Sequence, residues 1–328
     1  MPSPTLVIQT AFLGDVVLTI PLLQALAERH GPVDVVTTPA AAALIETHPA
    51  VRRAVRWDKN GKEGPGAWGL GRALQGEGYA RVYLPHRSVR SALVAKLTGA
   101  PERVGFADAP PLSRFLYTRT EPRDATQHES VRLLGLLGPE ARGPGSDWRM
   151  SLTDSDRATA REWMAANGIT PGFVAMAPGS IWGTKRWPYY PALAKLLERP
   201  VVAIGGPEDA ALGEGIVAAS GQARSAIGRL SLRQSAALIQ EAALLVTNDS
   251  APLHLATAVG TPILAIFGPT VPAFGYGPIR PGDRVAEIAL DCRPCSPHGP
   301  QVCPLGHHKC MREQSAEAIA SAIRAMLG

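Results

Sequence analysis

The sequence predicts an α/β protein built from two doubly wound domains, since strand-like and helix-like segments alternate along a chain long enough for two cores. Short apolar runs followed by polar turns and amphipathic segments are typical of parallel sheets covered by helices on both faces. One hydrophobic core rarely grows beyond about 250–300 residues, so 328 residues favour two domains. Ligands of such domains bind outside the carboxyl ends of the strands, so we expect a central cleft that both domains face.

In the first half, an apolar strand at 5–9 is followed by a turn at 10–14 and one helix over 15–29, which Gly31 should end. The same alternation continues with further strands and one more helix. The strands are expected at 33–38, 51–57 and 81–85, and the helix at 39–46. Residues 61–66 are expected to form a surface loop, and 136–148 to link the domains.

In the second half, Thr153 should cap a helix that Gly168 ends. The final stretch, 315–327, has helical spacing of its apolar residues. The strands of the second sheet are expected at 172–177, 200–204, 243–247 and 263–267.

The run 246–270, VTNDSAPLHLATAVGTPILAIFGPT, predicts a strand, a polar turn, a short helix that Gly260 ends, and a second strand. The start of such a helix offers free N–H groups and partial positive charge to an anion above the sheet edge. Alternatively, Asp249 and Ser250 only cap the helix.

Composition indicates a soluble globular protein, with 45% hydrophobic and 19% charged residues. Neither a run of about 18 apolar residues nor a basic segment followed by a secretory core occurs, so neither a transmembrane helix nor a signal peptide is expected. We therefore expect a cytoplasmic protein.

Positive charge is concentrated in residues 51–132, which hold 15 Lys and Arg against 8 Asp and Glu. This segment could be an ordinary solvated face, or it could meet a phosphorylated acceptor held at a membrane. Nucleic acid is a weaker alternative, because aromatic residues make up only 5% of the chain and no nucleic-acid motif occurs.

Three motifs occur in order along the chain: QTAFLGDVVLTIPLL at 9–23, APGSIWGTKRWP at 177–188 and NDSAPLHLA at 248–256. Together they resemble the bacterial ADP-heptose:lipopolysaccharide heptosyltransferases, a family of GT-B glycosyltransferases. The resemblance extends over nearly the whole chain. It implies a Rossmann-like acceptor domain at 1–148, a Rossmann-like ADP-sugar domain at 149–312, and a C-terminal helix at 313–328 that could pack on the first domain.

Asp15 is the candidate general base, because a sugar hydroxyl must lose its proton as it attacks the anomeric carbon. In the family, the Gly-Asp pair after the first strand carries this role, and Gly14 with Asp15 matches it. The alternative is a carboxylate that only stabilises the start of a helix, where the dipole would weaken it as a base.

Lys185 is the second catalytic candidate, since a fixed cation stabilises the negative charge that builds on a departing diphosphate. By resemblance, Gly179, Ser180 and Lys185 contact the donor phosphates, and Gly14 is a further donor-binding candidate. No Asp-x-Asp motif stands at a plausible donor loop, so we expect no metal-bridged diphosphate and no cofactor besides the donor substrate, ADP-heptose.

The other donor contacts also follow from the resemblance. Glu208 matches a position that binds the adenosine ribose, and Leu230 could lie against the adenine. At the start of the predicted helix, Asp249, Ser250, Ala251 and His254 would meet the phosphates or the donor sugar, although a lone histidine on a helix is often only packed.

His86, Arg87 and Arg90 follow the strand at 81–85 and are the acceptor-side candidates, because a phosphorylated saccharide needs cationic contacts. A solvated helix start is almost as good an explanation of these residues.

Four cysteines, Cys292, Cys295, Cys303 and Cys310, lie together near the C-terminus. Their spacing is compatible with a structural zinc site, and a cytoplasmic setting disfavours disulfides. The spacing is not that of a named zinc fold, so loop thiols are the alternative. Similar segments occur in part of the heptosyltransferase II subgroup.

The resemblance implies an inverting transfer of L-glycero-D-manno-heptose from its ADP form to the lipopolysaccharide inner core. The expected acceptor is heptosyl-Kdo-lipid A, reached by a peripheral protein at the cytoplasmic face of the inner membrane. The alternatives are addition of the first heptose to Kdo, a nucleotide-sugar epimerase of the same architecture, and a non-catalytic scaffold.

Overall fold

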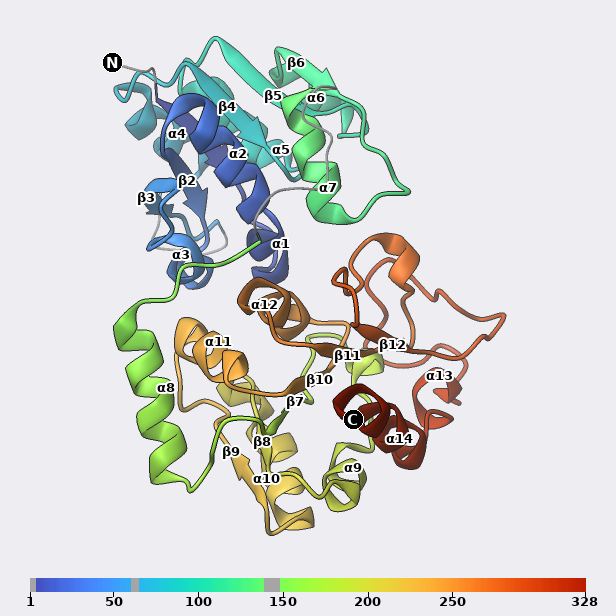
Figure 1. Cartoon of the computed structure of the whole chain (residues 1–328). Helices are drawn as coiled ribbons and strands as arrows, with labels where there is room; N and C mark the ends of the chain where they lie inside the picture. The colour runs from blue at the N-terminus through green and yellow to red at the C-terminus, as the bar shows by residue number, and fades with distance from the viewer. Residues whose placement is uncertain (1–3, 60–64, 139–147) are drawn as a thin grey trace. The chain divides into compact units, whose positions relative to one another are not determined.

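The computed structural model describes residues 4–59, 65–138 and 148–328, which form two compact units, Met1–Ser151 and Leu152–Gly328 (Figure 1). The boundary lies a few residues beyond the position expected at 148. Most of the expected loop at 61–66 and of the expected link at 136–148 falls outside the described residues.

The first unit contains a six-stranded parallel sheet in the order β3-β2-β1-β4-β5-β6. Its strands are β1 (Thr5–Ile8), β2 (Val33–Thr37), β3 (Val51–Arg56), β4 (Arg81–Leu84), β5 (Glu102–Phe106) and β6 (Arg119–Glu121). Its helices are α1 (Leu13–Leu18), α2 (Ile20–His30), α3 (Pro39–Ile45), α4 (Ala67–Gln75), α5 (Val89–Leu97), α6 (Pro111–Leu116), α7 (Glu129–Leu134) and the 3-10 turn η1 (Gly135–Leu137).

The second unit contains another six-stranded parallel sheet, in the order β12-β11-β10-β7-β8-β9. Its strands are β7 (Val174–Ala177), β8 (Val201–Ala203), β9 (Ala223–Ser225), β10 (Leu244–Asn248), β11 (Ile263–Ile266) and β12 (Arg284–Ala286). Its helices are α8 (Asp154–Ala166), α9 (Tyr190–Leu196), α10 (Ala210–Ala219), α11 (Leu232–Gln240), α12 (Ala251–Val259), α13 (Lys309–Arg312) and α14 (Ala316–Leu327), with 3-10 turns η3 (Gly183–Lys185), η4 (Pro207–Asp209) and η5 (Pro272–Phe274).

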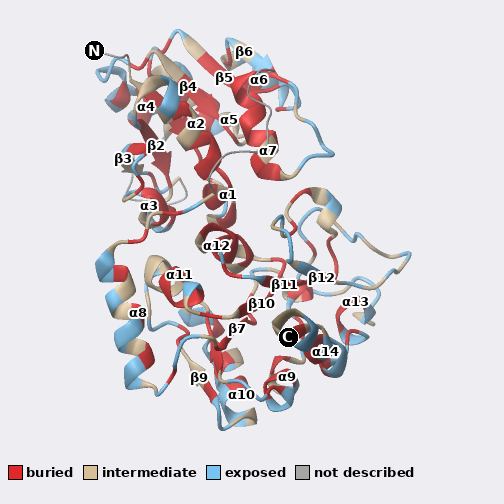
Figure 2. Ribbon diagram, in the orientation of Figure 1, coloured by how far each residue is buried: buried red, intermediate tan, exposed pale blue. Residues whose placement is uncertain are grey.

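These two doubly wound sheets confirm the predicted fold class. In each sheet the strand order reverses beside the unit's first strand, β1 or β7. The central strands are buried along their whole length, which explains their nearly continuous apolar sequences (Figure 2). Among the described residues, no helix is both long and apolar enough to cross a membrane.

The predicted strand-helix-strand run is confirmed as β10, α12 and β11. Gly260 ends α12 with a left-handed conformation (φ 85°), as a glycine after a helix commonly does. Thr153 and Asp156 likewise form the predicted capping arrangement at the start of α8.

The single helix expected at 15–29 is wrong, because the chain forms two helices that meet at Thr19. Pro21 has no N–H group and cannot continue the ladder of α1, so a second helix begins there. The Thr19 hydroxyl donates to the Asp15 carbonyl at 2.7 Å. The break confines Asp15 to a short helix directly after β1.

Four strands, β5, β6, β9 and β12, were not predicted, and three of them have only three residues. Polar residues such as Glu102, Arg119 and Arg284 interrupt their apolar pattern. The second sheet therefore continues past the expected last strand at 263–267.

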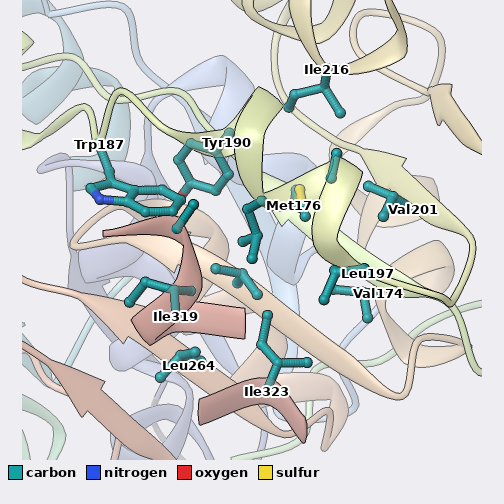
Figure 3. Close-up of a cluster of buried hydrophobic side chains, with 14 of the residues drawn as sticks. Val174, Met176, Trp187, Tyr190, Leu197, Val201, Ile216, Leu264, Ile319 and Ile323 are labelled. Atoms are coloured by element: carbon teal, nitrogen blue, oxygen red, sulfur yellow. The ribbon is translucent and has the colours of Figure 1, made fainter. Parts of the chain in front are cut away.

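Helix α14 packs in the hydrophobic core of the second unit (Figure 3). Ile319 and Ile323 point to that core with Trp187 and Leu264, and α14 lies against α9. Helix α14 therefore belongs to the second unit, and its expected packing on the first domain stays a prediction.

We expect Ile319→Ala to lower the free energy of unfolding of the second unit by about 2–4 kcal/mol, because it leaves a cavity at a fully packed position. Chemical denaturation followed by circular dichroism would measure the change. The exposed Arg324 on the same helix provides the control, since Arg324→Ala should change stability by no more than about 0.5 kcal/mol. Equal effects of the two substitutions would contradict the assignment of α14 to this core.

Candidate active site

The side chain of Asn248 joins two loops at the carboxyl edge of the second sheet. Its Oδ1 accepts hydrogen bonds from the backbone N–H of Trp187 and from the hydroxyl of Tyr190, both at 3.2 Å. Its Nδ2 donates to the carbonyls of Pro178 at 2.9 Å and Gly179 at 3.3 Å. A fully buried amide with all these partners holds the segment after β7 against the end of β10.

This connection brings the predicted residues Lys185 and Asp249 together. Lys185 Nζ lies 2.6 Å from Asp249 Oδ2, and both residues are only 8% exposed. The Thr270 hydroxyl donates to the same carboxylate oxygen at 2.7 Å. The ammonium is therefore fixed in place and keeps two further N–H donors besides the one given to Asp249.

Helix α12 begins beside this ion pair. Its N-cap residue Ser250 makes no side-chain cap hydrogen bond, and the Asp249 carboxylate is bound to Lys185 instead. The alternative that Asp249 and Ser250 serve only as caps therefore fails. Ala251 is the first residue of α12, and His254 is buried with its ring 6.4 Å from that of Tyr276.

Asp209 is a candidate that sequence reasoning missed. It is 7% exposed, and a β-carbon on Gly179 would overlap its carboxylate, while one on Gly205 would lie 2.7 Å from it. Burial and then Glu208 raise the pKa of Asp209, against the Gly206 N–H and a nearby arginine. The only signal was the pair of glycines before Pro-Glu-Asp, which leaves room for a carboxylate.

The remaining donor-side candidates lie around this edge of the second unit. Ser180 is half-buried, and its hydroxyl accepts a hydrogen bond from the Trp182 N–H at 3.3 Å. Glu208 is exposed on η4, directly over Gly206, and Leu230 is half-buried. No contact brings Leu230 to the Lys185–Asp249 pair, so its adenine role stays a prediction.

In the first unit, Asp15 lies in the first turn of α1, preceded by the buried Gly14. The Phe12 N–H donates to Asp15 Oδ2 at 3.1 Å. Burial and the negative charge of Glu129 raise the pKa of Asp15 to about 6, against the Phe12 N–H, Arg123 and Lys59. A carboxyl group with this pKa is ionised at neutral pH and is a stronger base than an ordinary aspartate.

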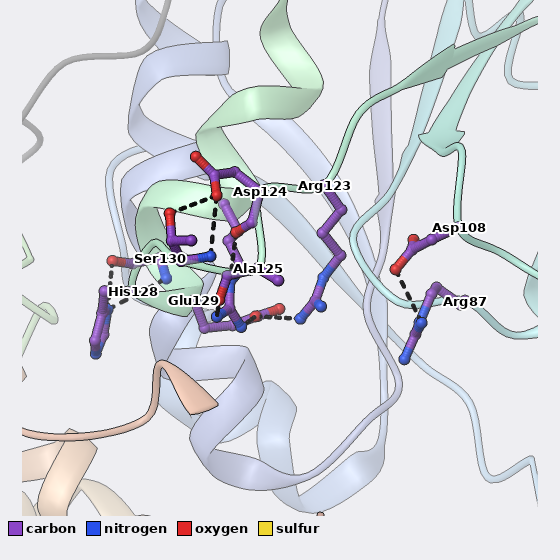
Figure 4. A network of polar contacts seen from close by, with 10 residues as sticks. Arg87, Asp108, Arg123, Asp124, Ala125, His128, Glu129 and Ser130 are labelled. Atoms are coloured by element: carbon purple, nitrogen blue, oxygen red, sulfur yellow. Dashed lines mark hydrogen bonds and ion pairs between the residues drawn. The ribbon is translucent and has the colours of Figure 1, made fainter. Parts of the chain in front are cut away.

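Two charged residues, Glu129 of α7 and Arg123 of the preceding loop, lie close enough to Asp15 to shift its pKa. Figure 4 shows their contact with each other. Glu129 accepts from Arg123 at 2.5 Å and from Arg132 at 3.0 Å, and its side chain is only 8% exposed. Lys59, whose charge lowers the pKa of Asp15, donates from Nζ to the Thr10 carbonyl at 2.5 Å. Sequence reasoning missed these residues, because they are separated from Asp15 by long stretches of chain.

The three acceptor-side candidates have different surroundings. The His86 ring is within hydrogen-bond distance of the Ser91 hydroxyl at 3.0 Å, and burial with the charge of Lys59 lowers its pKa to about 4. His86 is thus neutral and supplies no charge to a phosphate. Arg87 is exposed and pairs with Asp108 at 3.0 Å, while Arg90 donates to the Lys59 carbonyl at 2.8 Å.

The four cysteines are unlinked thiols of the second unit. Within residues 4–59, 65–138 and 148–328, no three or more His, Cys, Asp or Glu side chains are arranged to hold a metal ion. Burial and the neighbouring thiols raise the pKa of Cys310 to about 11. The structural zinc site therefore stays a prediction.

The chain is similar in sequence to characterised heptosyltransferases. It is 26% identical to lipopolysaccharide heptosyltransferase 2 of Escherichia coli, over 85% of this chain and 90% of that protein. It is 29% identical to lipopolysaccharide heptosyltransferase 1 of Pseudomonas aeruginosa, over 83% of this chain and 81% of that protein.

Solved structures share the fold. The E. coli ADP-heptose heptosyltransferase II structure superposes with a TM-score of 0.81 at 23% identity, covering 99% of this chain and 98% of that one. E. coli heptosyltransferase WaaC with ADP-2-deoxy-2-fluoro heptose gives 0.73 at 21% identity, covering 98% and 99%. The GT-B architecture expected from the motifs is thereby confirmed.

The model of glycosyltransferase family 9 (heptosyltransferase) matches residues 67–307, most of the chain. This match agrees with the three sequence motifs and with the two parallel sheets. The chain therefore belongs to glycosyltransferase family 9 and is a glycosyltransferase.

Proposed function

We propose that the protein transfers L-glycero-D-manno-heptose from its ADP form to the inner core of lipopolysaccharide, adding the second heptose to heptosyl-Kdo-lipid A. The observation that carries the proposal is Asp15, a half-buried carboxylate directly after β1 whose pKa is raised to about 6. The names of the relatives and the heptose donor analogue in the WaaC structure support the choice of sugar and acceptor.

In the proposed reaction, Asp15 takes the proton from the attacking hydroxyl as its oxygen bonds to the anomeric carbon. A base with a pKa near 6 remains mostly ionised at neutral pH and accepts the proton more readily than one near 4. A single displacement of this kind inverts the anomeric centre and forms no covalent enzyme intermediate.

The bond from the anomeric carbon to the diphosphate breaks in the same step, and the diphosphate gains negative charge. Lys185 and the N–H groups at the start of α12 stabilise this charge, and because they are already fixed they need little reorganisation. Asp249 holds Lys185 in position and can accept a hydrogen bond from a hydroxyl of the donor sugar. Ser180 and Gly179 supply further polar groups beside it.

For the rest of the donor, Glu208 binds the ribose hydroxyls and Leu230 covers the adenine. On the acceptor side, Arg87 and Arg90 bind phosphate groups, whereas neutral His86 holds Thr10 and Ser91 in place. The proposal places the protein at the cytoplasmic face of the inner membrane, where its lipid-linked acceptor would be presented.

The specific competitor is addition of the first heptose, because the Pseudomonas aeruginosa relative is a heptosyltransferase 1 at 29% identity. Release of ADP from ADP-heptose should be measured with heptosyl-Kdo-lipid A, with Kdo-lipid A and without acceptor. ADP release that requires heptosyl-Kdo-lipid A supports addition of the second heptose. Preference for Kdo-lipid A selects the competitor, and conversion of the sugar without acceptor selects an epimerase.

We expect Asp15→Asn to lower kcat/KM by about 10²–10⁴-fold, because the general base is lost. In the wild type, kcat/KM should rise with pH through about 6 and then level. The exposed Glu28 provides the control, since Glu28→Gln should keep both the rate and the profile. An unchanged pH profile in the asparagine variant would refute the assignment of the base.

Asp15→Asn should increase the stability of the protein at neutral and higher pH, although it lowers activity. A carboxyl group whose pKa is raised in the folded protein contributes stability at low pH that is lost as the pH rises through about 6. At pH 8, Asp15→Asn should therefore increase the free energy of unfolding, by about 1–2 kcal/mol. Denaturation at pH 4 and pH 8 would test this, with little gain expected at pH 4.

Lys185→Gln should lower kcat by about 10²–10³-fold, because the fixed cation that stabilises the leaving diphosphate is lost. Steady-state kinetics with saturating acceptor would measure the effect. The exposed Lys195 of α9 is the matched control, and Lys195→Gln should retain the wild-type rate. Similar rates for the two variants would argue against a role for Lys185 in the reaction.

Gly179→Ala should reduce transfer at least about tenfold, because its β-carbon would overlap the Asp209 carboxylate and displace the donor loop. Asp209→Ala in the same chain should restore part of the activity by making room. Gly221, where a β-carbon meets nothing within 4 Å, is the control glycine. Failure of the double variant to recover, with its fold intact, would show that the overlap is not the cause.

A further inference from the structure

Helices α4, α5 and α6 form one layer of the first unit. They connect β3 to β4, β4 to β5 and β5 to β6 in turn, and α5 contacts both of its neighbours. Since successive right-handed crossovers in one direction place their helices on the same side of a parallel sheet, the three helices cover one face. We call the outer side of this layer the α4–α6 surface.

Three large apolar side chains are exposed on these helices. Trp68 on α4 is 58% exposed, and Leu112 and Phe115 on α6 are 58% and 84% exposed. Leu112 and Phe115 are three residues apart and so project from one side of α6, while Ser113 is fully buried beneath them. Such exposure costs free energy in water, and the neighbouring pair Leu112 and Phe115 is an exposed apolar group of the kind that marks a contact surface.

The same helices carry only positive charge. Their sequences contain four cations and no aspartate or glutamate. All four cations are exposed: Arg72, Arg90, Lys96 and Arg114. In α8, by contrast, carboxylates and arginines are mixed along the helix, as on an ordinary solvated face.

The carboxylates that lie between these helices in the sequence do not cancel this charge locally, because each already has an arginine partner. Between residues 67 and 116 the sequence has three of them. Glu77 pairs with Arg53, Glu102 with Arg81 and Arg119, and Asp108 with Arg87. The α4–α6 surface therefore combines exposed aromatic and aliphatic side chains with an excess of cations.

We propose that the α4–α6 surface docks on an anionic phospholipid bilayer. Its cations would lie at the lipid phosphates, while Trp68, Leu112 and Phe115 would enter the boundary between headgroups and acyl chains. Charge complementarity selects this occupant, since the negative leaflet surface attracts clustered Lys and Arg. The inference rests on the proposed function, in which the acceptor is a lipid, and supplies the means of reaching it.

The first test is flotation of the full chain with vesicles of phosphatidylethanolamine and phosphatidylglycerol, compared with vesicles of phosphatidylcholine alone. The wild type should bind the anionic vesicles and bind them less as salt increases. The variant Leu112→Ser/Phe115→Ser should partition at least about tenfold more weakly, because the inserted apolar area is lost. The matched control is Val302→Ser/Leu305→Ser in the second unit, where the residues are 78% and 62% exposed.

The charged part of the surface is tested separately with Arg72→Gln/Lys96→Gln/Arg114→Gln. These three residues belong to none of the binding groups assigned above. Each cation near an anionic surface strengthens binding about fivefold, so the triple variant should lose most of its affinity and most of its salt dependence. Thermal melting of each variant shows whether the fold is retained, as surface substitutions predict.

Activity separates this proposal from the proposed function. With an acyl-free heptosyl-Kdo saccharide in solution, the Leu112/Phe115 variant should transfer heptose at the wild-type rate. With the lipid-linked acceptor in anionic vesicles, it should be at least about fivefold slower. The docking proposal is refuted if the wild type does not bind anionic vesicles. It is also refuted if the Leu112/Phe115 variant binds them as strongly as the wild type does. Absence of transfer to both acceptors by wild type, with binding intact, overturns only the function.

Discussion

The buried amide of Asn248 is the constraint on which the arrangement of Lys185 and Asp249 depends. It accepts two hydrogen bonds and donates two, and so fixes the end of β10 to the segment that follows β7. Those two segments carry Asp249 and Lys185, which are distant in sequence and 2.6 Å apart in space. Replacing the amide with an apolar group would leave buried donors and acceptors unpaired, so the cost would fall on the site and the core together.

The two units handle negative charge in opposite ways. In the second, the carboxylate of Asp249 has an ammonium and a hydroxyl in contact, and it helps to keep a cation fixed in a buried place. In the first, Asp15 has one backbone N–H in contact, while burial and Glu129 oppose its ionisation. The two environments therefore suit the two carboxylates to different roles. Asp249 is suited to holding a cation, and Asp15 is suited to accepting a proton.

Sequence reasoning predicted the central strands, because β1, β7 and β10 are buried throughout, β4 is buried except at Arg81, and the apolar pattern of all four is strong. It could not find edge strands such as Arg119–Glu121, whose pairing is decided by the neighbouring strand rather than by their own residues. It also missed the break at Thr19, although Pro21 was visible in the sequence.

The sequence motifs made individual residues of the candidate site predictable, but not the contacts between residues of different motifs. Lys185 and Asp249 each stood in a motif, but their contact depends on Asn248 and could not be inferred from spacing. Asp209, Thr270 and Glu129 were missed, because their importance comes only from the groups that the fold places beside them.

The environment of Asp15 has a cost that an ordinary helix start would not have. An aspartate in the first turn of a helix is normally stabilised in its charged form, which lowers its pKa. Here, burial and Glu129 outweigh that benefit and the attraction of Arg123 and Lys59, so the ionised protein carries unfavourable electrostatic energy at neutral pH. Glu129 is itself held in place by ion pairs with Arg123 and Arg132. A protein selected only for stability would have no reason to keep both carboxylates near each other, whereas one that needs a base of intermediate strength gains from the pair.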